Sequence, residues 1–132
     1  MTTTTAVPRL SAAGTFIEAL AGQDFARMAS TMDAEAQLTA LLPPGLREFT
    51  GPEAISAAFT GWFGDVDDFE LVEADIGKIG PRLHLRWRIR VRAARLGAGT
   101  FVVEQQVYAD DGTDGRLSRL ALVCSGYCPE CR

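Results

Sequence analysis

The sequence has 132 residues, of which 47% are hydrophobic and 23% charged, and its formal net charge is −4 at pH 7. This length and even composition indicate one domain with one hydrophobic core, and the net negative charge argues against a general nucleic-acid-binding protein. The start has no basic segment followed by an apolar run, and no stretch approaches the ~20 apolar residues that cross a bilayer. We therefore expect a cytoplasmic protein with no nucleic-acid or membrane partner.

Three helices are predicted in the first half of the chain. Ser11 is expected to cap the first and Asp24 a second, shorter one. Thr50 and Glu53 have the spacing of a capping box at the start of a third helix. Apolar residues recur at helical spacing in each: Phe16, Ile17 and Leu20; Phe25, Met28 and Met32; Ile55, Phe59, Trp62 and Phe63. Residues 37–42 are apolar but of uncertain type, and Pro43, Pro44 and Gly45 after them favour a turn.

Strands are predicted in the second half. Residues 82–92, RLHLRWRIRVR, alternate between apolar and polar side chains without interruption, which is typical of a half-buried strand. Residues 69–76 before it and residues 101–109 and 117–123 after it are also expected to be extended, with turns rich in glycine between them. Helices followed by strands predict an α+β domain in which a curved antiparallel sheet folds over the helices.

The polar face of the alternating strand carries His84 and a stripe of arginines, for which two explanations remain open. The stripe could bind an anionic ligand or a nucleic acid, or the acidic segment 65–75 could neutralise it across the strand pair, with pairs such as Glu73 with Arg86. Glu104 could contribute from the other side. We favour a salt-bridged outer face or dimer surface, although Phe69 and Leu71 fit that register poorly. His84 is then expected to be a solvated residue of the sheet.

The order of these segments resembles the nuclear transport factor 2-like superfamily, and within it the SnoaL-like branch. The resemblance is carried by "ALAGQDFARM", the Pro-Pro-Gly turn, "GPEAISAAFTGWF" and a long antiparallel run that ends in "LVCSGY". It covers residues 10–127 and implies a cone-like, cystatin-like barrel with a pocket between sheet and helices, often in a homodimer. We thus expect a mobile tail over residues 1–10, one domain over 11–127 and a cysteine-bearing tail over 128–132.

The resemblance implies either a binding protein or an enzyme such as an isomerase, cyclase or dehydratase. Members that resemble ketosteroid isomerase use a tyrosine on the first helix and an aspartate beyond the second. Here Phe16 stands at the first position, and residues 37–42 contain no carboxylate. A phenyl ring cannot donate a proton to the substrate, and a segment without a carboxylate cannot remove one. The proton-transfer chemistry of ketosteroid isomerase is therefore disfavoured. No catalytic residue is predicted, and whether the protein is an enzyme stays open.

A small hydrophobic molecule is the expected ligand. The predicted pocket-lining residues are Phe16, Leu20, Phe59, Trp62, Trp87, Val103 and Gln105. Alternation places Gln105 among apolar neighbours, and a buried amide needs hydrogen-bond partners. Gln105 therefore either bonds to protein groups or points at a ligand.

All three cysteines, Cys124, Cys128 and Cys131, lie in the last residues of the chain. The CxxC spacing of Cys128 and Cys131 suits a disulfide or one thiophilic metal such as zinc, and Cys124 could supply a third thiolate. His84, a carboxylate, water or a second subunit would then complete the site. A metal-binding or thiol-redox protein is therefore the alternative function, and an inert cysteine tail also remains open.

Overall fold

The structure, a computed structural model, describes residues 8–130. Its helices are α1 (Pro8–Ala21), α2 (Phe25–Ala29) and α3 (Pro52–Phe63). Its strands are β1 (Met32–Leu42), β2 (Gly45–Thr50), β3 (Asp68–Ile79), β4 (Arg82–Arg92), β5 (Phe101–Asp111), β6 (Leu117–Cys124) and β7 (Cys128–Pro129), with short 3-10 turns η2 (Ala94–Leu96) and η3 (Thr113–Gly115). Within residues 8–130 no helix is both long and apolar enough to span a membrane.

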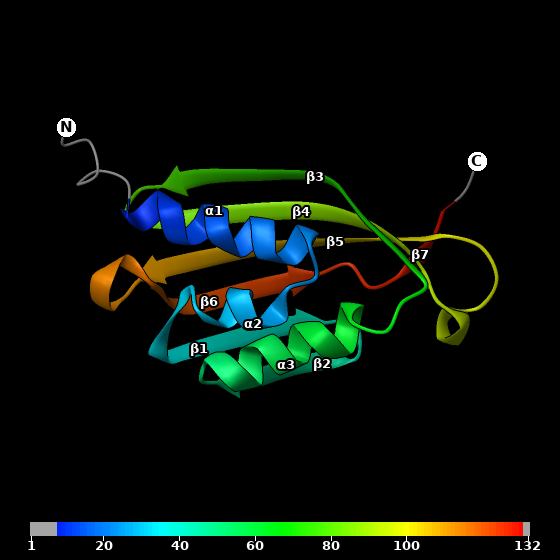
Figure 1. The fold of residues 1–132 in the computed structure, drawn as a ribbon, viewed down its shortest axis with the longest axis horizontal. Helices are drawn as coiled ribbons and strands as arrows, with labels where there is room; N and C mark the ends of the chain where they lie inside the picture. Colours follow the sequence, from blue (N-terminus) through cyan, green and yellow to red (C-terminus); the bar gives the residue numbers. More distant parts are fainter. Residues whose placement is uncertain (1–7, 131–132) are drawn as a thin grey trace.

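One sheet of seven strands forms the body of the molecule, in the order β2-β1-β6-β5-β4-β3, with β7 added alongside β5. The helices lie over one face of this curved sheet (Figure 1). The predicted run of four antiparallel strands is present as β3 to β6. The sheet as a whole is mixed, because β1 pairs in parallel with β6. The α+β class and the sheet folded over N-terminal helices are thus confirmed.

The first hairpin was the main element that the sequence pattern did not predict. β1 begins at Met32, so the prediction that Met32 belongs to the second helix is wrong. Residues 37–42, whose type was uncertain, form the second half of β1, and the turn at Pro43 and Pro44 leads into β2. β2 has β1 as its only strand partner in the described chain, and most of its side chains are exposed. An exposed edge strand needs no regular apolar alternation, so it leaves a weak signal.

Of the three predicted helix starts, the one at Asp24 is correct, and those at Ser11 and Thr50 are wrong. Asp24 caps α2, where its carboxylate accepts the backbone N–H of Arg27 at 3.1 Å. The capping box at Thr50 is wrong, since Thr50 still pairs with Gln37 in the sheet and Gly51 occupies the cap position without a side-chain bond. Pro52 at the first turn has no N–H to satisfy, so this helix needs less capping. α1 begins at Pro8, ahead of Ser11, and the rest of the predicted N-terminal tail, residues 1–7, lies outside the described chain.

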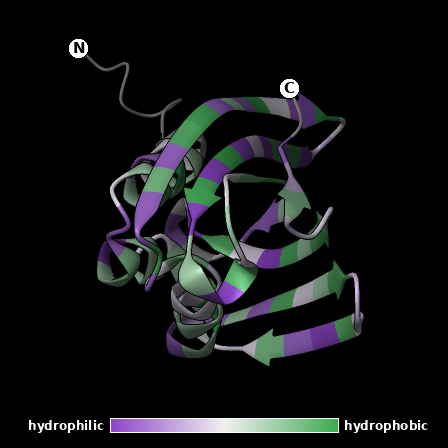
Figure 2. Cartoon of the chain, turned by 90° about the vertical axis from the view of Figure 1, so that its right-hand side faces the viewer, coloured by the Kyte–Doolittle hydropathy of each residue, from purple (hydrophilic) through white to green (hydrophobic). Residues whose placement is uncertain are grey.

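β4 has the geometry that its alternation predicts. Leu83, Leu85, Trp87, Ile89 and Val91 are all buried against the helices. Figure 2 shows hydrophobic and hydrophilic residues alternating along the strands. Each apolar side chain therefore faces the core, and each polar one faces outward.

The arginine stripe is neutralised within the chain. Arg86 forms ion pairs with Glu73 at 3.2 Å and with Asp75 at 2.7 Å, and Arg88 pairs with Glu104. The other pairs are Arg82 with Asp110, Arg90 with Glu70 and Glu130, Arg92 with Asp68, and Arg95 with Asp65. The prediction of a salt-bridged outer face is confirmed. Each pair is exposed enough that it adds little to stability.

A β-bulge explains why Phe69 and Leu71 fitted the predicted register poorly. Leu71 pairs with Ile89, but the next paired residue is Glu73, opposite Arg88, so Val72 is the extra residue. One extra residue reverses the in–out alternation. Asp68 and Glu70 before the bulge, and Glu73 and Asp75 after it, therefore all reach the outer face.

Candidate functional site

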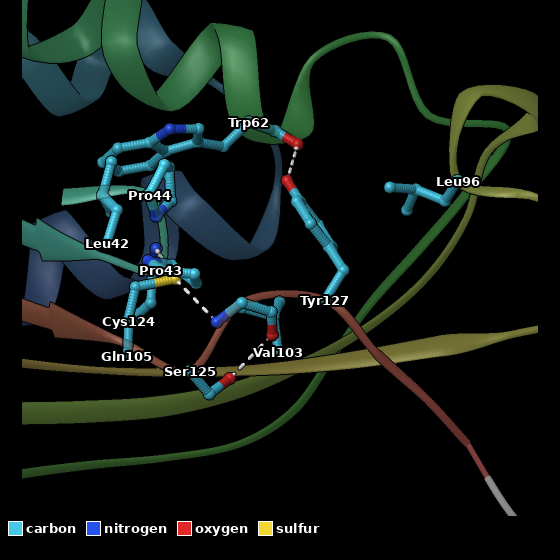
Figure 3. Close-up of a pocket in the computed structure, with 11 residues that line it drawn as sticks. Leu42, Pro43, Pro44, Trp62, Leu96, Val103, Gln105, Cys124, Ser125 and Tyr127 are labelled. Atoms are coloured by element: carbon cyan, nitrogen blue, oxygen red, sulfur yellow. Dashed lines mark hydrogen bonds between the residues drawn. The ribbon is translucent and has the colours of Figure 1, made fainter.

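A cavity of about 560 Å³ lies at the end of the sheet where β1 and β6 finish and β5 begins. Because β1 and β6 are parallel, their C-terminal ends lie side by side, and the segments that follow them leave the sheet together. The lining side chains lie between the end of α3, which carries Trp62, and the chain after β6, which carries Ser125 and Tyr127 (Figure 3). The lining residues are Leu42, Pro43, Pro44, Trp62, Leu96, Val103, Gln105, Cys124, Ser125, Gly126 and Tyr127.

Gly126 lets the C-terminal segment pass close to the Pro43 turn. Its φ is +83°, and a Cβ at this position would lie 2.6 Å from Pro43 Cγ. Both the backbone conformation and the close approach favour glycine. The two walls of the cavity contributed by β1 and by the end of β6 therefore meet at this residue.

Tyr127 ties the C-terminal segment to the end of α3. Its hydroxyl donates to the backbone carbonyl of Trp62 at 2.5 Å, as drawn in Figure 3. Arg95 donates to the same carbonyl at 2.9 Å, and its guanidinium lies 5.5 Å from the centre of the tyrosine ring. Burial raises the pKa of Tyr127 above its ordinary value of 10.0, while Arg95 acts in the opposite direction. Tyr127 is therefore a neutral donor at physiological pH.

Gln105 is the buried polar side chain of the cavity wall and is only 1% exposed. Its Oε1 accepts the indole N–H of Trp87 at 2.9 Å, and its Nε2 donates to Cys124 Sγ at 3.4 Å. The backbone N–H of Gly126 also donates to that sulfur, at 3.3 Å. Of the two roles considered for Gln105, the structure thus shows bonds to protein groups.

The predicted pocket residues fall into two groups. Trp62, Val103 and Gln105 line the cavity. Phe16, Leu20, Phe59 and Trp87 are fully buried and do not line it. Phe16 contacts the rings of Phe59 and Trp87 at centroid distances of 5.6 and 5.7 Å. Aromatic side chains therefore fill this part of the space between sheet and helices. The cavity lies beyond them, where β1 and β6 end.

The residue pattern does not predict that the Pro-Pro turn, Leu96 and Tyr127 lie at the cavity. Their common location depends on the parallel pairing of β1 with β6, which residue patterns did not reveal. The sequence predicted a turn at Pro43, Pro44 and Gly45. It did not predict that the strand before this turn pairs in parallel with residues 117–123.

His84 lies on the outer face, away from the cavity. Its ring stacks on Tyr108 at 4.8 Å, and its Nε2 is 3.0 Å from Gln106 Oε1. The expectation that His84 belongs to the polar face of the sheet is therefore correct, and its side chain is partly buried there.

The cysteines are only partly described. Cys124 lines the cavity, Cys128 is exposed in β7 with its Sγ 3.7 Å from the Gly126 carbonyl, and Cys131 lies outside the described residues. Within residues 8–130 no group of three His, Cys, Asp or Glu side chains is arranged to hold a metal ion. The shared zinc or disulfide of Cys128 and Cys131 stays a prediction.

The lining of the cavity is apolar and carries no Asp, Glu, His, Lys or Arg side chain among the residues that the structure describes. Its titratable side chains are Cys124 and Tyr127. The chain thus belongs to the class of α+β domains in which helices cover one face of a curved sheet. An apolar cavity large enough for a small molecule lies where β1 and β6 end.

Comparison with solved structures identifies that class. No protein-family model and no curated protein matches the sequence. An uncharacterised cystatin-fold protein from Novosphingobium aromaticivorans matches with a TM-score of 0.64 and 21% identity, over 86% of this chain and 96% of that one. A putative SnoaL-like polyketide cyclase from Shewanella denitrificans gives 0.66 and 13%, over 89% and 90%. A nuclear transport factor 2-like protein from Burkholderia xenovorans gives 0.67 and 11%, over 89% of both chains.

The chain therefore shares the fold of these cystatin-fold and nuclear transport factor 2-like proteins, and the predicted resemblance is confirmed at the level of the fold. At such identities the similarity establishes the fold and leaves the reaction open, because this fold carries many functions.

Proposed function

We propose that the protein binds a small, uncharged, hydrophobic molecule in the cavity between β5, α3 and the end of β6. The observation that carries the proposal is a volume of about 560 Å³ with an almost wholly apolar lining and no charged side chain among its described residues. This size falls in the range of small-molecule sites in proteins. A charged ligand would lose its hydration there without gaining an ion pair.

Binding is a better-supported role than proton-transfer catalysis of the isomerase, cyclase or dehydratase type. Such reactions generally employ a carboxylate or an imidazole within hydrogen-bond reach of the substrate. The described lining offers Cys124 and Tyr127 instead, and the Tyr127 hydroxyl is already bonded to the Trp62 carbonyl. We therefore propose a binding domain. It shares its fold with the SnoaL-like cyclase from Shewanella denitrificans, and we do not carry the activity of that protein over to it.

Titration with the neutral fluorescent probe N-phenyl-1-naphthylamine tests this proposal. We expect saturable binding at one site with enhanced probe fluorescence. Leu96→Trp places a large side chain into the cavity from the η2 turn and should weaken binding at least tenfold. Ile79→Trp is the matched control, since Ile79 is 58% exposed in β3 and does not line the cavity. Non-saturable binding, or equal effects of the two variants, would contradict the proposal.

We also propose that the protein forms a homodimer through the outer face of the sheet. Leu41, Leu46 and Val123 lie side by side there, since Leu41 is the strand partner of both others. Their exposed fractions are 50%, 57% and 51%. The neighbouring ion pairs carry both signs of charge, so two copies of the face can meet without net repulsion.

A further inference from the structure

The orientation of the Gln105 amide is fixed by its neighbour Trp87. An indole N–H can only donate, so the Gln105 atom 2.9 Å from it has to be the carbonyl oxygen. The amide nitrogen is thereby turned toward Cys124, which lines the cavity. Since Trp87 is fully buried in the core, the amide cannot flip without leaving a buried donor unsatisfied.

The amide nitrogen has more donor capacity than its present partner uses. Nε2 carries two N–H groups, and its acceptor in the described chain is Cys124 Sγ at 3.4 Å. A thiol sulfur is a weak acceptor, and this one also receives the Gly126 N–H at 3.3 Å. Gln105 therefore keeps a buried donor at the inner wall of the cavity that is only weakly satisfied.

The other polar groups of the wall are already engaged with protein partners. The Ser125 hydroxyl donates to the Gly126 carbonyl at 2.8 Å and accepts the Glu104 N–H at 2.9 Å. Tyr127 donates to the Trp62 carbonyl. Apart from the weak S–H donor of Cys124, what the wall offers to a ligand is thus the amide donor of Gln105 in apolar surroundings.

We propose that the cavity selects a neutral hydrophobic ligand that carries a carbonyl group, whose oxygen accepts a hydrogen bond from Gln105 Nε2. A carbonyl oxygen is a stronger acceptor than the thiol, so the ligand improves the bonding of a buried group as it binds. This inference rests on the proposed function and adds a substrate class to it. A ligand of the same shape without the carbonyl gains apolar burial but leaves the amide as it is.

The pair 9-fluorenone and fluorene tests the inference, because the two planar molecules differ by a carbonyl in place of a methylene group. A purely apolar cavity prefers fluorene, since the ketone loses hydration on entry. With the Gln105 bond, fluorenone should bind wild-type protein about fivefold to tenfold more tightly, as measured by quenching of tryptophan fluorescence. Fluorene binding as tightly as fluorenone overturns the inference and leaves the proposed function standing. If neither molecule binds, both proposals fail.

Variants and a spectroscopic signature assign the effect to Gln105. The carbonyl stretching band of bound fluorenone should lie at lower wavenumber than in hexane, as a hydrogen bond requires. Gln105→Met should abolish both the band shift and the preference for fluorenone, while fluorene affinity changes little. The double variant Trp87→Phe, Gln105→Met has no orphaned indole N–H and should behave in the same way. A band shift that persists in the double variant would overturn the assignment to Gln105.

Discussion

The indole N–H of Trp87 donates to Oε1 of Gln105 at 2.9 Å, and both side chains are buried at directly paired positions of β4 and β5. The pair satisfies the polar atom of the largest buried side chain in the core, and it also sets which end of the amide faces the cavity. One hydrogen bond thus links the stability of the core to the chemistry of the candidate site.

A double-mutant cycle should detect this link. Gln105→Met leaves the Trp87 N–H buried without an acceptor and should cost about 1–3 kcal/mol in the free energy of unfolding. Trp87→Phe removes the donor and leaves a small gap. Because the double variant has neither orphaned group, its loss should be smaller than the sum of the two single losses. Urea denaturation measures each term, and strictly additive losses would show that the bond is not formed.

Gly126→Ala should destabilise the protein through both backbone strain and a contact with Pro43. The positive φ alone costs about 1–2 kcal/mol, and the added methyl group meets Pro43 Cγ. Gly99→Ala is the control, since Gly99 has a φ of +89° and no atom near the position of the new Cβ. Thermal and urea unfolding should rank Gly126→Ala below Gly99→Ala. Equal losses would mean that Pro43 moves aside freely.

The raised pKa of Tyr127 predicts a loss of stability at alkaline pH. The folded state holds this proton more tightly than the unfolded chain, so the contribution is fully present below pH 10.0 and is lost as the pH rises through the folded pKa. Tyr127→Phe removes the bond to Trp62 and should cost about 0.5–1.5 kcal/mol near neutral pH. The difference from wild type should shrink at higher pH. Tyr108→Phe, on the outer face, is the control for the general effect of losing a tyrosine.

Light scattering measures the mass of the protein in solution and so tests whether it forms a homodimer. Wild-type protein should have twice the 14.2 kDa mass of a single chain. Leu41→Glu places a charge in the apolar row of the outer face and should give monomers. Ile79→Glu is the matched control, because Ile79 is 58% exposed on the opposite edge strand β3. A wild-type protein that stays monomeric at high concentration argues decisively against this assembly.

Titration with cobalt and zinc tests whether Cys128 and Cys131 bind a metal ion. If Cys128 and Cys131 share a metal, reduced protein should show a thiolate-to-cobalt charge-transfer band and bind zinc more tightly than Cys128→Ser. Binding should weaken as the pH falls, because the thiols have to lose their protons. The absence of both effects rules out the metal, and three free thiols after mild oxidation rule out the disulfide as well.

The sequence by itself determined the elements whose signal is local. The unbroken alternation around Trp87 defined β4 and its buried face, Asp24 marked the start of α2, and the acidic residues before β4 correctly predicted partners for the arginines. Each of these features follows from periodicity or from neighbours along a hairpin. Gln105 was likewise recognisable as a buried amide, since strand alternation leaves it no other position.

Tertiary structure alone decided where the cavity lies and what it presents. The parallel pairing of β1 with β6 joins segments far apart in the chain, and it places Pro43, Gly126 and Tyr127 around one opening. The same packing fills the predicted pocket near Phe16 and Phe59 with aromatic rings. Such pairings depend on the balance of loop entropy and burial over the whole domain, and no short stretch of sequence records that balance.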